Sequence, residues 1–264
     1  MPARVAEFAV LIAIGSVKGS PGVTSTALAL AAAWPRPVVL LEADPAGGDL
    51  AYRCNAAHGG PLAPHKGLLK LAASVRAGAA AAESVNAQAE RLACGVDVVQ
   101  GVTSAAQGRG IARLWSMIAA ACESAEHDVI ADVGRLDRTT PVMALVREAT
   151  AVLMVTTRAL GPVMQLTDGL QDLMPALAEP RAVPVVPILI GDDSRSERDC
   201  MDLDDLLHRA GLPTRPTRGL AYDPRALARL EDGEHVDRRL ARSLLLRSVK
   251  TIVSDLLESA EAVA

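Results

Sequence analysis

The segment Ala13–Ala33, AIGSVKGSPGVTSTALALAAA, constrains the fold of this chain more than any other stretch. An apolar run over Phe8–Ile14 leads into a loop with three glycines, and an alanine- and leucine-rich segment begins at Thr24. The pattern predicts a strand, a glycine loop and the start of a helix. Such a unit directs backbone N–H groups and the positive end of the helix dipole at one small volume, so its default ligand is a phosphate. The loop glycines are Gly15, Gly19 and Gly22.

The nearest phosphate-binding motif is the P-loop, G-x-x-x-x-G-K-[ST]. Gly15 and Gly22 do not serve as its two outer glycines, because six residues separate them instead of four. The motif fits better when its last glycine is aligned with Gly22. Gly22 is then the last glycine, Val23 stands where the lysine belongs, and Thr24 is the hydroxyl that would hold magnesium.

The loop KGSPGVTS, residues 18–25, resembles position for position the KGGVGKTT loop of the ParA/MinD family of partitioning and positioning ATPases. Lys18 stands at the family's early signature lysine, and Val23 replaces its second lysine. The resemblance implies ATP or ADP with Mg²⁺ as cofactor, and a homodimer in which Lys18 reaches the partner's phosphates. It assigns the nucleotide to Lys18, Gly19, Ser20, Gly22, Val23, Thr24 and Ser25.

Strand-like and helix-like runs alternate along the rest of the chain, which predicts a doubly wound, mostly parallel α/β sheet flanked by helices. Hydrophobic residues are 50% of the chain but aromatic residues only 2%, so we expect a core of Ala, Val, Leu and Ile, as in a sheet covered on both faces. We expect one domain over residues 1–264, with two short helices in the irregular stretch His58–Gln88. Expected strands are Pro37–Leu41, Val96–Val99, Asp128–Ala131, Ala151–Thr156 and Val183–Ile190; expected helices are Gly67–Arg76, Gly110–Cys122, Pro141–Glu148, Gly161–Leu177, Met201–Ala210 and Arg238–Leu257.

Two segments that carry carboxylates also resemble segments of the ParA/MinD family. The stretch VVLLEADP ends in Glu42 and Asp44, where the family carries D-x-D-P and its second aspartate organises the attacking water; Asp44 inherits that position. The alternative is a loop aspartate before a proline. In HDVIADVGR, Asp132 is placed at a strand end to hold magnesium together with Thr24, and Gly134 is free to move toward a γ-phosphate.

Weaker positions concern the base and the following arginines. Asp192 stands where the family often carries an adenine-reading asparagine, and Ala221 and Asp223 hold positions of its I-P-x-D segment, with the proline lost. Arg135 and Arg138 are expected at an interface or in solvent.

The net charge of −4 excludes a globally basic nucleic-acid binder. The C-terminal third nevertheless has an acidic block followed by a basic stretch, which is either a surface for non-specific DNA binding or a solvated helix face. We expect reduced cysteines, no metal besides magnesium, a cytoplasmic protein and no membrane insertion. The acidic block is Asp192, Asp193, Glu197, Asp199, Asp202, Asp204 and Asp205; the basic stretch is Arg215, Arg218, Arg225, Arg229, Arg238, Arg239, Arg242, Arg247 and Lys250.

Three functions compete. The first is a nucleotide-dependent dimerising switch for positioning, at most a weak ATPase because Val23 replaces the lysine. The loss of a charged donor to phosphate costs roughly 1.5 to 3 kcal/mol. Its partner would be a pilus or secretion ATPase, as in actinobacterial MinD-like proteins that the chain resembles, or a DNA-partition partner. The second is a scaffold that keeps the fold without nucleotide. The third is a Rossmann oxidoreductase with Glu42 as ribose carboxylate, which the glycine spacing disfavours.

Overall fold

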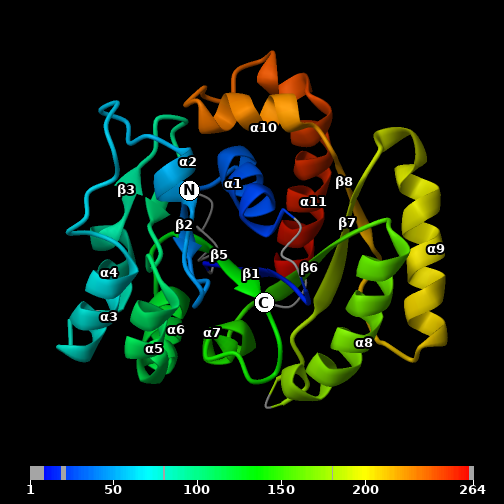
Figure 1. Cartoon of the computed structure of the whole chain (residues 1–264), viewed down its shortest axis with the longest axis horizontal. Coiled ribbons are helices and arrows are strands. Elements are labelled where there is room, and N and C mark those ends of the chain that lie inside the picture. The colour runs from blue at the N-terminus through cyan, green and yellow to red at the C-terminus, as the bar shows by residue number, and fades with distance from the viewer. Residues whose placement is uncertain (1–8, 19–21, 80, 180, 262–264) are drawn as a thin grey trace, which may run out of the picture.

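The computed structural model describes residues 9–18, 22–79, 81–179 and 181–261. Within these residues the centre is an eight-stranded sheet of order β3-β4-β2-β5-β1-β6-β7-β8 (Figure 1). The pairs from β4 to β8 are parallel, and β3 pairs antiparallel with β4. The doubly wound, mostly parallel α/β sheet is therefore confirmed. The strands are β1 (Leu11–Ser16), β2 (Val38–Glu42), β3 (Glu90–Arg91), β4 (Asp97–Val99), β5 (Asp128–Arg135), β6 (Ala151–Thr157), β7 (Val185–Gly191) and β8 (Arg218–Ala221).

Helices cover both faces of the sheet (Figure 1). One apolar cluster joins the sheet to α3, α4, α6, α7, α8 and α9, and a second joins it to α1, α2, α10 and α11. The helices are α1 (Val23–Ala33), α2 (Leu50–Arg53), α3 (Leu68–Arg76), α4 (Ala81–Gln88), α5 (Ala105–Gly110), α6 (Trp115–Glu123), α7 (Met143–Arg147), α8 (Leu160–Leu177), α9 (Ser196–Arg209), α10 (Pro224–Glu231) and α11 (Leu244–Glu261), with short 3₁₀ turns η1 (Ala112–Leu114), η2 (Asp193–Arg195) and η3 (Leu240–Arg242).

Strand β1 shows why the central strands are apolar throughout. Leu11 and Ala13 belong to one cluster, and Ile12 and Ile14 belong to the other. Because successive side chains point to opposite faces and both faces are covered, every position is buried. The carboxyl ends of these parallel strands meet at one edge of the sheet, where ligands of such folds bind.

The sequence-based boundaries are wrong in two places that concern the site. The last long helix begins at Leu244 rather than Arg238, because the chain turns in η3 and Ser243 is extended. Strand β5 does not end at Asp132 but continues to Arg135. A register shift in its pairing with β1 and a left-handed Gly134 (φ 62°) accompany this extension.

The irregular stretch His58–Gln88 holds α3 and α4, which confirms the two short helices expected there. None of the described helices has the length and apolar character that a membrane span requires.

Candidate phosphate and nucleotide site

The first helix opens beside the carboxyl edge of the sheet. Gly22 is its N-cap residue with φ 79°, a left-handed conformation that residues with a side chain rarely adopt, and glycine has no side chain that could cap the helix. The first N–H groups of a helix have no partner within the helix. The amino end of α1 therefore offers donors and a positive dipole end to an anion, as the glycine loop predicted.

Three of the predicted loop ligands lie at the border of the described chain. Lys18 is exposed, directly after β1. Gly19 and Ser20, which the family resemblance assigns to the nucleotide, lie outside the described residues, as does Pro21.

Val23, at the position of the missing lysine, is a core residue. Its side chain is 1% exposed and belongs to the apolar cluster beneath α1. It offers no donor to a phosphate, so the part of the site that the lysine would serve is apolar in this chain.

The magnesium residues expected from the sequence are in direct contact. Thr24 Oγ1 donates to Asp132 Oδ2 at 2.5 Å, and the backbone N–H of Gly134 donates to Asp132 Oδ1 at 3.0 Å. Asp132 is 3% exposed. Burial raises the pKa of Asp132 to about 7 against the lowering effect of these two hydrogen bonds, and the nearby carboxylates of Glu42 and Asp44 raise it further.

Asp44 lies next to this pair. A Cβ built on Gly134 would come within 2.0 Å of Asp44 Oδ2, so only a glycine lets the carboxylate approach β5 this closely. Asp44 Oδ1 also accepts a 2.7 Å hydrogen bond from the N–H of Ala46, which is the local turn expected of an aspartate before a proline. Burial raises its pKa. Asp44 therefore makes the local turn contact of a loop aspartate and also lies beside Asp132.

Glu42, unlike Asp44 and Asp132, binds backbone N–H groups of two other segments. Its carboxylate is 2% exposed and accepts three backbone N–H bonds, from Asp49 and Leu50 at Oε1 and from Gly101 at Oε2, each 2.9 Å long. Burial raises its pKa, while these bonds act in the opposite direction. A carboxylate used in this way fixes the start of α2 and the chain after β4, and it is not available to a ribose.

The donor set suits a magnesium ion that is shared with phosphates. Among the described residues no group of three or more His, Cys, Asp or Glu side chains could hold a metal ion. One buried aspartate and one hydroxyl beside an open helix end match Mg²⁺, which keeps several waters and takes phosphate oxygens rather than a full protein cage. The residues present therefore fit a magnesium nucleotide, except at Val23.

A cavity of about 360 Å³ adjoins the start of α1. Gly22, Ser25 and Thr26 line one side, and the segment that follows β8 lines the other. Ala221 and Asp223, expected near the base, are both in its lining, and the Asp223 carboxylate caps α10 through the N–H of Ala226 at 3.1 Å. The lining is mostly apolar, which suits a planar base.

Asp192 is not part of this cavity lining. Its side chain is exposed and accepts a 3.0 Å hydrogen bond from the N–H of Ser194, which caps η2. The sequence position matched the family's base-reading residue, but here the aspartate is committed to a local turn.

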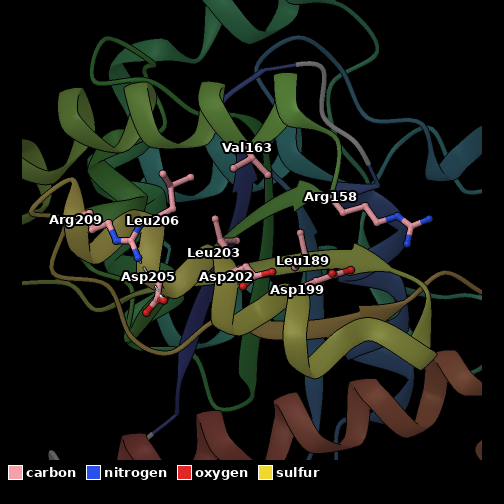
Figure 2. Close-up of a pocket in the computed structure, with 9 residues that line it drawn as sticks. All are labelled: Arg158, Val163, Leu189, Asp199, Asp202, Leu203, Asp205, Leu206 and Arg209. Carbon is pink, nitrogen blue, oxygen red and sulfur yellow. Dashed lines mark ion pairs between the residues drawn. The ribbon is translucent and has the colours of Figure 1, made fainter.

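A second hollow of about 420 Å³ lies between α8 and α9 (Figure 2). Its lining combines apolar residues, Val163, Leu189, Leu203 and Leu206, with two arginines and three aspartates of the acidic block. None of the loop or carboxylate residues described above lines it. The charged residues are Arg158, Asp199, Asp202, Asp205 and Arg209.

Several other charges have structural partners. Arg138 pairs with Asp172 of α8, and in the basic stretch Arg218 pairs with Asp255 and Arg229 with Glu234. These pairs favour a solvated, internally compensated surface. The four cysteines are free and buried, as expected.

No sequence motif singles out Arg53. In the structure its Nη2 donates to Ser25 Oγ at 2.8 Å, at the beginning of α1. The two residues are 28 positions apart and belong to different elements. No motif links them, so only the folded chain reveals the contact.

Comparison with known proteins supports the fold. The chain superposes on a ParA family ATPase from Chlorobium tepidum TLS with a TM-score of 0.70 at 16% identity, covering 93% of this chain and 98% of that one. It superposes on the septum site-determining protein MinD of Pyrococcus horikoshii OT3, complexed with Mg-ADP, with a TM-score of 0.61 at 16% identity, covering 97% and 96%.

A third match is the MinC:MinD cell division protein complex of Aquifex aeolicus, with a TM-score of 0.56 at 12% identity, covering 97% and 95%. No protein-family model and no curated protein matches the sequence. The chain therefore has the ParA/MinD-like P-loop fold.

Proposed function

We propose that the chain is a nucleotide-dependent switch of the ParA/MinD kind, which binds ATP or ADP with Mg²⁺ and acts in intracellular positioning or partitioning. The observation that carries the proposal is the contact between Thr24 and Asp132 beside the open amino end of α1. The neighbouring structure solved with Mg-ADP supports a nucleotide for this fold.

Each part of the site has a role in this proposal. The N–H groups at the start of α1 bind phosphate oxygens, and the cavity lined by Ala221 and Asp223 receives the base. Thr24 and Asp132 would hold Mg²⁺. The magnesium ion, when bound, offsets the negative charge of the phosphates. Asp44, which lies against Gly134, would orient a water in this proposal.

Hydrolysis in this proposal is weak or absent. The family's second lysine stabilises charge on the transferred phosphate, and Val23 is buried and apolar. Nucleotide occupancy, rather than turnover, would then set the state of the protein. Lys18, exposed after β1, is the residue that would reach the partner's phosphates in a homodimer.

The partner in this proposal is a protein, such as a pilus or secretion ATPase or a partition protein. The MinC:MinD complex supports the idea that a protein of this fold serves a protein partner. Non-specific DNA is a weaker candidate, because Arg218 and Arg229 already form ion pairs.

A scaffold without nucleotide is the second candidate, and the burial of Val23 favours it. The oxidoreductase reading is not retained, since Glu42 is occupied by three backbone donors.

Equilibrium binding of fluorescent ADP and ATP, with and without Mg²⁺, tests the proposal. We expect binding that Mg²⁺ strengthens, and loss of the Mg²⁺ effect in Asp132→Asn. Asp97→Asn, at a surface ion pair with Arg91, is the matched control. Absence of binding at millimolar nucleotide would favour the scaffold.

Sedimentation tests the dimer separately. ATP with Mg²⁺ should shift the wild-type protein toward a dimer, and Lys18→Ala should abolish the shift. A dimer that forms equally without nucleotide would contradict the switch.

A further inference from the structure

The nucleotide site lacks a cation at the position where P-loops carry one. Val23 is apolar and buried, and Lys18 is exposed directly after β1. A triphosphate or diphosphate at the amino end of α1 brings two or more negative charges that backbone N–H groups alone compensate weakly. Another cation within reach of α1 would strengthen binding.

Arg53 contacts the start of α1. Among the described residues it is the one lysine or arginine with a hydrogen bond to residues 22–26. Its Nη2 donates to the hydroxyl of Ser25, the third residue of α1, and Ser25 lines the 360 Å³ cavity. The guanidinium therefore contacts a residue that belongs both to the start of α1 and to the lining of the cavity, although Arg53 itself is not part of that lining.

The backbone of Arg53 is held in place from the opposite end of α2. Leu50, the first residue of α2, donates its N–H to the buried Glu42 carboxylate at 2.9 Å, and so does Asp49. Arg53 is the last residue of the same helical turn. The position of its Cα relative to the sheet is thus fixed by a contact that does not involve its side chain.

The guanidinium is shared with two carboxylates in this structure. Nη1 donates to Asp49 at 3.2 and 3.3 Å, Nε donates to Glu231 at 3.1 Å, and Nη2 forms a close ion pair with the same Glu231 oxygen. The Arg53 side chain is 24% exposed and the Glu231 side chain 23%. These carboxylate oxygens occupy donors that a phosphate oxygen would also use.

We propose that Arg53 binds the nucleotide phosphates in place of the absent P-loop lysine, and that Glu231 competes with the phosphates for its guanidinium. This inference rests on the proposed nucleotide binding. Arginine binds phosphate through two parallel N–H bonds, and a charged pair of this kind is stronger than a neutral hydrogen bond. Arg53 turns from Glu231 toward the phosphate while its hydrogen bond to Ser25 keeps it at the helix start.

The two partners give opposite expected effects. Removing the guanidinium should weaken ADP binding, whereas removing the charge of Glu231 should strengthen it, because the competing carboxylate is gone. A merely structural ion pair between α2 and α10 would show no gain in either variant. The sign of the Glu231 effect therefore separates ligand binding from stabilisation.

The experiment measures dissociation constants for Mg-ADP and for adenosine in five proteins: wild type, Arg53→Ala, Glu231→Gln, the double variant and Arg229→Ala. Arg229 is the matched control, since it lies on the same helix α10 and pairs with Glu234 rather than with α1 or α2. Circular dichroism confirms that each variant is folded.

We expect a loss of about 10-fold or more for Mg-ADP in Arg53→Ala, a gain of about 3-fold or more in Glu231→Gln, and no gain in the double variant. Adenosine binding should stay the same in all five proteins, because it has no phosphate. Arg229→Ala should behave like the wild type.

Two results would overturn the inference. One is wild-type Mg-ADP affinity in both Arg53→Ala and Glu231→Gln; the other is a Glu231→Gln gain that persists without Arg53. If the wild-type protein itself binds no ADP, the proposed function fails first, and the two failures are thereby distinguished. Should Arg53→Ala not fold, Glu231→Gln with an unchanged or lower affinity would still overturn it.

Discussion

The hydroxyl of Thr24, on the first turn of α1, donates to the buried carboxylate of Asp132, on β5, at 2.5 Å. The two residues are 108 positions apart, and the sequence predicts both of them at one magnesium ion. Their contact joins the loop-helix unit to the central strand and creates the centre of the candidate site.

Replacement of Thr24 by valine should destabilise the protein by about 1 to 3 kcal/mol, because the substitution leaves a buried carboxylate with one donor fewer. Urea denaturation followed by circular dichroism measures the change. Thr251→Val is the control, since Thr251 lies on the exposed side of α11 and bonds only within its helix. Equal stability of the two variants would show that the Thr24 hydroxyl contributes little.

The stability of the metal-free protein should fall as the pH rises from about 4 through about 7. The folded-state pKa of Asp132 is about 7, above its ordinary value of 3.8, so the native state binds the extra proton in this range. The protonated form stabilises the fold fully below the ordinary pKa, and this contribution is lost as the pH passes the folded-state value. It is on the order of 4 kcal/mol.

Thermal unfolding in a chelating buffer at pH 5 and pH 8 tests this dependence for the wild type and Asp132→Asn. Burial also raises the pKa values of Glu42 and Asp44, so the informative quantity is the difference between the two proteins. Parallel pH profiles would mean that Asp132 keeps an ordinary pKa.

Introduction of lysine at position 23 should raise both ADP affinity and phosphate release, because it restores a donor to the phosphates. It should also lower stability, since a buried apolar side chain is replaced by a charged one. Phosphate release in Val23→Lys is compared with Val23→Met, which changes the bulk without the charge. Absence of any gain over Val23→Met would show that the loop geometry has diverged.

Replacement of Glu42 by glutamine should loosen the start of α2. An amide has one oxygen for three N–H donors, and its NH₂ group would face either Gly101 or the pair Asp49 and Leu50. Amide hydrogen exchange should accelerate at all three residues, while Glu126→Gln on the exposed surface serves as control. Unchanged exchange at these amides would contradict the anchoring role.

The sequence was sufficient to predict those elements whose residue pattern is local and repeated. The buried runs of β1, β2, β5, β6 and β7 and the glycine loop predicted the sheet and the place of the site, because burial on both faces of a parallel sheet leaves few alternatives. The P-loop motif and the family resemblance assigned Thr24, Asp44 and Asp132 to one site, and in the structure these residues lie close together at the carboxyl edge.

The features that the sequence did not predict depend on contacts between residues far apart in the chain. Asp192 accepts a hydrogen bond within a local turn. Glu42 accepts hydrogen bonds from residues that are 7, 8 and 59 positions away in the sequence. Arg53 meets Glu231 across 178 positions. Contacts between residues so far apart leave no periodic pattern in the sequence, so the sequence alone could not reveal these partners.

The anchoring of α2 by Glu42 also limits what must move when Arg53 changes its partner. Leu50 is tied to the sheet through one carboxylate, whereas Arg53 is held at the other end of α2 by side-chain contacts. If phosphates bind here, the Arg53 side chain can exchange one anion for another while the backbone of α2 stays anchored. Such an exchange would then require no rearrangement of the α2 backbone.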